Sequence, residues 1–151
     1  MAIDSLRDIR DAMEAEIAAE LGSSYKKLAY LEDVEKNSFR TNNNRYGVRP
    51  LISSEVDGVT KNIHLTQSFE VVLTKGYYES SIDDTEQVER SLDNRENMLC
   101  IYKRLVNNRA GIPGTVINIQ NLVVSEPEYL VDEKVAVQRA TIDITYRFSL
   151  I

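Results

Sequence analysis

Alternating apolar and polar residues dominate the end of the chain. In the run ATIDITYRFSLI, residues 140–151, every second position is apolar, and the positions between carry Thr, Asp, Arg or Ser. This period of two is typical of a β-strand with one buried face and one wet face. We expect a strand from about Lys134 to Leu150 that is paired inside a sheet and lies near another chain.

Two other segments show the helical period. Residues 4–22 carry apolar side chains every three or four positions and end on Gly22, which suits the left-handed conformation that closes helices. Residues 80–108 predict a second helix, acidic near its start and basic near its end. The first helix is expected to bury Leu6, Ile9, Met13, Ile17 and Leu21, and the second Val88, Leu92, Leu99, Tyr102, Leu105 and Val106.

The middle of the chain predicts further strands around an irregular stretch. Residues 26–31, 63–73 and 115–124 have the apolar and β-branched content of strands. Residues 32–61 are rich in Asn and broken by Gly and Pro, so we expect a long irregular or extended loop there. Within it, YGVRPLIS predicts a strand that stops near Pro50, and Asp57-Gly58 predicts a turn.

This order of elements predicts one α+β domain over residues 1–151, a length that suits a single core. The sheet is expected to be mixed and mostly antiparallel, with two helices packed on one face. The last two strands flank the short segment SEPEYLVDE and are expected to form a long C-terminal β-hairpin.

Composition and charge narrow the function. A net charge of −6 argues against general nucleic-acid binding. No stretch approaches the ~18 apolar residues of a membrane span, and the charged N-terminal segment lacks a signal-peptide core. We therefore expect a soluble protein made in a reducing cytoplasm, without membrane contact. The single cysteine, Cys100, lies in a predicted helix, where a buried free thiol is the usual state.

Sequence patterns of catalysis and cofactor binding are missing. No nucleophile elbow, phosphate loop or dinucleotide motif occurs. The single histidine, His64, falls on the polar side of a predicted strand and has no second ligand for a metal. Paired acids such as Asp83-Asp84 fall at a helix start, where they favour the positive end of the helix dipole. We expect no enzyme, no cofactor and no metal site.

Two oppositely charged segments remain. Residues 36–49 hold four bases and no acid, and residues 126–133 hold four acids and no base. The simplest interpretation is two solvated loops. The functional alternative is that the basic segment meets an acidic surface of a neighbouring copy or another protein, or meets DNA. The candidate contact residues are Lys36, Arg40, Arg45, Arg49, Glu126, Glu128, Asp132 and Glu133.

The order and size of these elements resemble the tail terminator proteins of long-tailed bacteriophages and the cap proteins of related phage-tail-like machines. The resemblance covers nearly the full chain. It rests on the helix SLRDIRDAMEAEIAAEL, the phrase FEVVLTKGY with an acidic helix start after it, and the ending ITYRFSL. It implies a structural virion protein: a hexameric ring that caps the tail tube, stops its polymerisation and offers a docking surface to the head connector.

The resemblance also implies partners and a location. The partners are the tail tube protein, the head-tail connector or neck protein and, in contractile tails, the sheath, with DNA only in passage through the lumen. The location is the head-proximal end of the virion tail, after assembly in the host cytoplasm. Two alternatives stay open: another connector, neck or tail-completion protein, and a small-molecule-binding or enzymatic α+β domain, which would need a deep apolar pocket.

Overall fold

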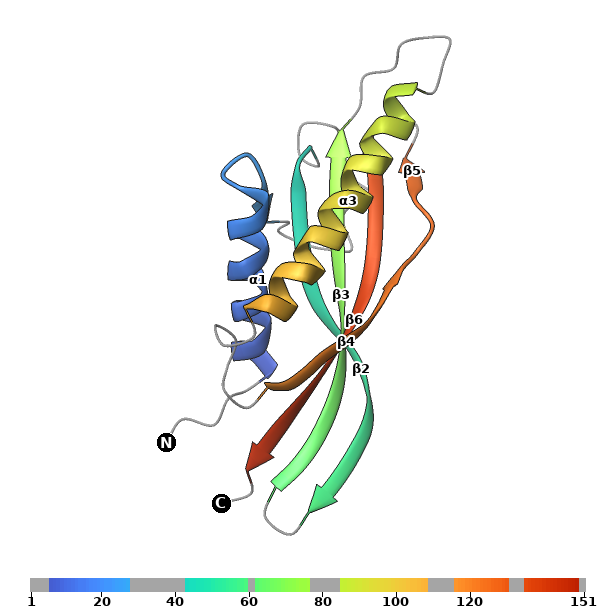
Figure 1. Cartoon of the computed structure of the whole chain (residues 1–151). Coiled ribbons are helices and arrows are strands. Elements are labelled where there is room, and N and C mark those ends of the chain that lie inside the picture. The colour runs from blue at the N-terminus through green and yellow to red at the C-terminus, as the bar shows by residue number, and fades with distance from the viewer. Residues whose placement is uncertain are drawn as a thin grey trace.

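Two helices lie on one face of a twisted sheet in the computed structural model, which describes residues 6–27, 43–59, 62–76, 85–108, 116–130 and 135–149 (Figure 1). The helices are α1 (Leu6–Leu21) and α3 (Thr85–Asn107). The described residues form six strands: β1 (Lys26–Lys27), β2 (Arg45–Val59), β3 (Asn62–Gly76), β4 (Val116–Val124), β5 (Glu128–Leu130) and β6 (Val135–Ser149). The predicted α+β class is confirmed.

The sheet has the strand order β1-β2-β3-β6-β4, and β5 pairs with β6 beyond the end of β4. All neighbouring strands are antiparallel except β1 and β2, which are parallel. β3 and β6 stay in register without interruption from Asn62–Ser149 to Gly76–Val135. The final strand is therefore paired on both sides, as its alternation predicted. The C-terminal hairpin is also confirmed, with β5 inserted in its connection.

The core lies between the helices and one face of the sheet. The alternation in β6 buries Ala140, Ile142, Ile144 and Tyr146. The helices and β3 contribute the largest fully buried side chains, among them Ile9, Met13, Ile17, Phe69, Leu73, Met98, Ile101 and Leu105. The predicted buried face of α1 is confirmed, and Gly22 follows it with a φ of +84°, in the left-handed region that favours glycine.

The predicted irregular loop at 32–61 is wrong for its second half. β2 continues through Pro50 to Val59 and pairs with β3 along that length. Proline is tolerated because β2 lies near the edge of the sheet, with only the short β1 beyond it. Register shifts on either side of Ser53 absorb the irregular sequence as β-bulges. Residues 28–42 lie outside the described residues.

The predicted turn at Asp57-Gly58 is also wrong. Asp57 pairs with His64 and Gly58 pairs with Ile63, so both residues belong to the β2–β3 ladder. β2 runs on to Val59, which pairs with Asn62, the first residue of β3. Gly58 lies inside β2, which is a bulged strand. Glycine is found at such irregular strand positions as well as in turns, so the Asp-Gly pair gave the wrong position for the turn.

The buried face of α3 differs from the predicted stripe. Met98, Ile101 and Leu105 point into the core together with Ser91 and Asn94. Of the predicted stripe, Leu105 is fully buried and Tyr102 is half-buried, whereas four members are exposed: Val88, Leu92, Leu99 and Val106. Cys100 is exposed as well, so the predicted buried thiol is wrong. Polar Asn94 is accommodated in the core because its Nδ2 donates to the Ala136 carbonyl at 3.2 Å.

Candidate assembly surface

The sheet face opposite the helices is polar over its middle. The hydroxyls of Thr66 and Thr145, opposite each other on β3 and β6, lie 3.0 Å apart. Ser68 donates to Asp143 Oδ1 at 2.6 Å, and Asn121 Nδ2 of β4 donates to Asp143 Oδ2 at 3.0 Å. These polar side chains form hydrogen bonds with one another across β3, β6 and β4. This part of the face is therefore polar, and the side chains named here already have hydrogen-bond partners.

A chain of alternating charges continues the same face. Glu70 Oε1 on β3 accepts from Arg49 Nε on β2 at 2.9 Å and from Arg139 Nη1 on β6 at 3.1 Å. Arg139 Nε lies 3.5 Å from Glu128 Oε1 on β5. The Glu70 side chain is only 13% exposed, so its two partners are screened less by solvent than a surface pair would be. These four side chains, two basic and two acidic, together carry no net charge.

Two of the predicted contact residues, one from each charged segment, belong to this group of four ion-paired side chains. Arg49 and Glu128 lie on strands and carry ion pairs within the molecule. Arg45 opens β2 and is half-buried, and Glu126 is exposed in the connection between β4 and β5. A role for these residues in contacts between copies stays a prediction. The other candidates lie outside the described residues: Lys36, Arg40, Asp132 and Glu133.

The residues that join these charges, Glu70 and Arg139, are not marked by any motif in the sequence. Glu70 and Arg139 fall at polar positions of strands, where the alternation places them on the face away from the helices. Their diagonal neighbourhood depends on the register of β3 against β6, which the sequence alone does not fix. The sequence did indicate one thing: the alternation of apolar and polar residues places Glu70 and Arg139 on the polar face of their strands.

Each edge of the sheet is largely open in the described part of the chain. β4 forms one edge, and β2 forms the other except where β1 pairs with Arg45 and Tyr46. Both edge strands are irregular: Asn121 in β4 has a φ of +57° beside a register shift, and β2 contains Pro50. Bulges and prolines of this kind limit uncontrolled pairing of edges, because they interrupt the row of available backbone groups.

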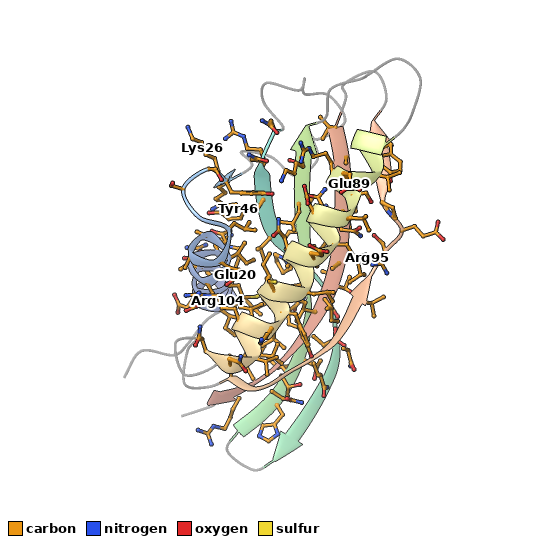
Figure 2. The ribbon with its side chains drawn as sticks, turned by 45° about the horizontal axis from the view of Figure 1, so that its top comes forward. Glu20, Lys26, Tyr46, Glu89, Arg95 and Arg104 are labelled. Atoms are coloured by element: carbon orange, nitrogen blue, oxygen red, sulfur yellow. The ribbon has the colours of Figure 1, made fainter. Side chains whose placement is uncertain are left out.

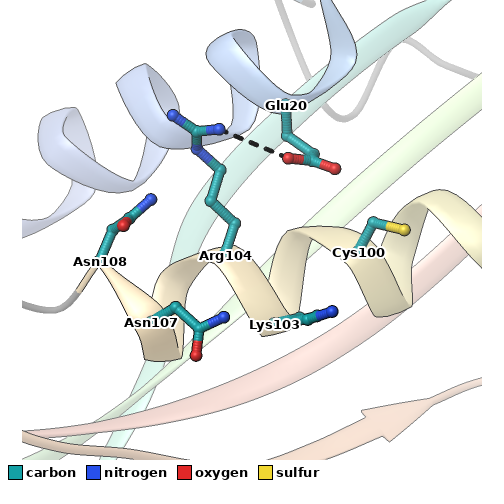
Figure 3. Close-up of a pocket in the computed structure, with 6 residues that line it drawn as sticks. All are labelled: Glu20, Cys100, Lys103, Arg104, Asn107 and Asn108. Atoms are coloured by element: carbon teal, nitrogen blue, oxygen red, sulfur yellow. Dashed lines mark hydrogen bonds and ion pairs between the residues drawn. The ribbon is translucent and has the colours of Figure 1, made fainter.

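A polar hollow of about 340 Å³ lies between the end of α1 and the C-terminal half of α3 (Figure 3). Arg104 crosses it: its Nε donates to Glu16 at 2.7 Å and its Nη1 to Glu20 at 3.5 Å. The hydrogen bond to Glu16 raises the pKa of Arg104, which stays cationic. The lining residues are Glu20, Cys100, Lys103, Arg104, Asn107 and Asn108. This lining differs from the apolar pocket that the small-molecule hypothesis requires.

The described residues contain no group of three His, Cys, Asp or Glu side chains that could hold a metal ion. His64 is half-buried and pairs in register with Arg147 of β6. Neither described helix is long and apolar enough to cross a membrane. Comparison with known proteins gives no match to a family model and none to a curated protein.

Proposed function

We propose that the protein is a structural component of a phage tail or a related injection machine. Copies of it form a ring on the end of the tail tube, stop tube polymerisation and present the surface that receives the head connector. The observation that carries the proposal is the sheet itself, which has helices on one face, paired polar groups on the other and a largely open strand at each edge.

The strand directions support closure of a ring from identical copies. Three antiparallel steps separate β2 from β4, so these two edge strands run in opposite directions. β4 of one copy can therefore meet β2 of the next in the antiparallel sense while all copies point the same way. Such a contact joins two different surfaces and closes into a ring when the rotation completes a circle.

The polar face suits the wall of a channel through which DNA passes. Phosphate binding is driven by Lys and Arg side chains that release counterions. On this face Arg49 and Arg139 already lie against Glu70 and Glu128, and the whole chain carries a net charge of −6. A wall of paired charges lets DNA slide without retaining it.

The test is mass by light scattering over a concentration series, with negative-stain images, for the protein alone and after mixing with the tube protein. We expect rings near six times 17.2 kDa and arrested growth of the tube once the tube protein is present. Tube growth that continues unchanged, with no ring in either sample, would overturn the proposal. Binding to the head connector without binding to the tube would favour the alternative of a connector or neck protein.

A further inference from the structure

α3 carries an apolar stripe that is exposed in the described part of the chain. Val88, Leu92, Leu99 and Val106 are 48%, 47%, 52% and 43% exposed. Their spacings of four, seven and seven residues place all four within about 40° of one another around the helix. Arg95 and Tyr102 fill the gaps, so the six positions follow the alternating three- and four-residue steps of a helix–helix seam.

The stripe lies on the flank of α3 that is turned away from α1. On the opposite flank Asn97 donates to the Tyr25 hydroxyl at 3.2 Å, and Arg104 reaches Glu16 of α1. Figure 2 shows Arg95 on the side away from α1, whereas Arg104 lies between the two helices. The stripe is therefore separate from the core face of α3, from the α1 contact and from the polar face of the sheet.

We propose that this stripe is the contact surface for α3 of a second copy, with the two helices antiparallel. Exposed charges beside the stripe change sign along it: Glu89 and Glu96 flank its first half and Lys103 flanks its second half. A two-fold axis near Glu96 brings Glu89 of each copy to Lys103 of the other. A parallel pair would instead place Glu89 level with Glu89 and Lys103 level with Lys103.

The two-fold axis also brings the two Glu96 side chains together. Arg95 of each copy is exposed at the same level and offsets that repulsion. Antiparallel packing further sets the two helix dipoles against each other in the favourable sense. The charges therefore favour a self-complementary pair over other orientations of the same stripe.

The length of the stripe sets the strength that we expect. From Val88 to Val106 it spans about 27 Å of helix. One helix face buries less than the ~800 Å² per partner of a standard stable interface, so we expect a dimer that dissociates in roughly the micromolar range. This pairing does not depend on the proposed ring, since it uses neither sheet edge.

The first test measures the mass of the full chain by light scattering over a series that spans the micromolar range. We expect the mass to rise from 17.2 kDa toward twice that value. Leu92→Ser combined with Leu99→Ser should hold the protein at the monomer mass. Val123→Ser is the matched control, because Val123 is an apolar side chain on β4 that is 60% exposed, and it should dimerise like the wild type. Circular dichroism checks that each variant is folded.

The second test is a charge exchange. Glu89→Lys and Lys103→Glu should each weaken dimerisation by roughly tenfold, because each pair occurs twice across the axis. The double variant should restore it, because the pairs re-form with exchanged signs. A monomer at every concentration, or a dimer that survives the serine substitutions, would overturn the inference. So would a dimer that neither charge reversal weakens. A ring that survives the serine substitutions leaves the proposed function standing.

Discussion

Gln67 interrupts an otherwise apolar run on the core side of β3. It is 2% exposed, and its Nε2 donates to the carbonyl oxygens of Leu51 and Ser68. Leu51 lies at the register shift between Pro50 and Ser53, where β2 carries residues that face no partner in β3. The bulge leaves backbone groups without a ladder bond, and the buried amide satisfies one of them.

Gln67→Leu is therefore expected to destabilise the protein even though it makes the core more apolar. The Leu51 carbonyl would lose its donor in a partly buried setting, and a lost hydrogen bond of this kind costs about 1 kcal/mol or more. Urea unfolding of the two proteins at pH 7 measures the difference. A variant as stable as the wild type would show that water satisfies the carbonyl, or that the bulge relaxes.

We expect Tyr146 to make the free energy of unfolding depend on pH in the alkaline range. Burial raises the pKa of its hydroxyl above the usual value, which is about 10 in unfolded chains. The folded protein holds this proton more tightly than the unfolded chain. Its contribution is therefore fully present below the unfolded pKa and is lost as pH rises through the raised folded pKa. Above about pH 10, the free energy of unfolding should fall less steeply in Tyr146→Phe than in the wild type. Equal slopes would contradict this.

At the scale of elements, α3 shows what periodicity alone can and cannot decide. Its sequence offers two apolar stripes, one with Met98 and Ile101 and one with Leu92 and Leu99. Most of the residues predicted to be buried belong to the second stripe and are exposed. The chain buries the first stripe together with Leu105, and this face includes Asn94 because the Ala136 carbonyl lies within reach. Such a bond depends on tertiary contacts, which local pattern does not contain.

Elements with one dominant signal were predicted closely. The alternation of β6 and the three-and-four spacing of α1 each point to a single face, and Gly22 ends α1 as expected. The continuation of β2 past Pro50 was missed, because Pro50 and Gly58 normally punctuate loops. Their tolerance here follows from the place of β2 beside only a two-residue strand, a property of the assembled sheet.

The end of β6 provides a prediction for a strand. Removing residues 148–151 deletes the register pairs Phe148–Ile63 and Ser149–Asn62. We expect the free energy of unfolding to fall by about 1–3 kcal/mol, because each lost backbone hydrogen bond of these pairs contributes about 0.5–1.5 kcal/mol. Removing residues 150–151 alone is the matched control, because it leaves every β6 pair in place. Thermal unfolding compares the two truncations, and equal melting temperatures would show that the end of β6 does not stabilise the sheet.

At the scale of the whole molecule, the fold pairs charged side chains that lie far apart in the sequence. Arg49 and Glu128 lie in sequence segments of opposite charge. The fold connects them through Glu70 and Arg139 into a row of ion pairs with no net charge. The runs were visible in the sequence, but their neutralisation was not, because it depends on which strands become neighbours. Among the described residues, the exposed stripe of α3 and the largely open edge strands likewise depend on how the elements pack, which the local sequence does not contain.

Two charge reversals in the basic segment separate stability from assembly. Arg49→Glu would set a second carboxylate against Glu70 in place of a guanidinium 2.9 Å away, and we expect the free energy of unfolding to drop by about 1 kcal/mol. Arg40→Glu should leave the melting temperature unchanged and weaken ring assembly with the tube protein. That weakening should fade at high ionic strength, since salt screens contacts between charges on different molecules. Thermal unfolding and light scattering of both variants give the comparison. If Arg40→Glu assembles like the wild type at low salt, Arg40 makes no ring contact, and the ring contact lies at the strand edges.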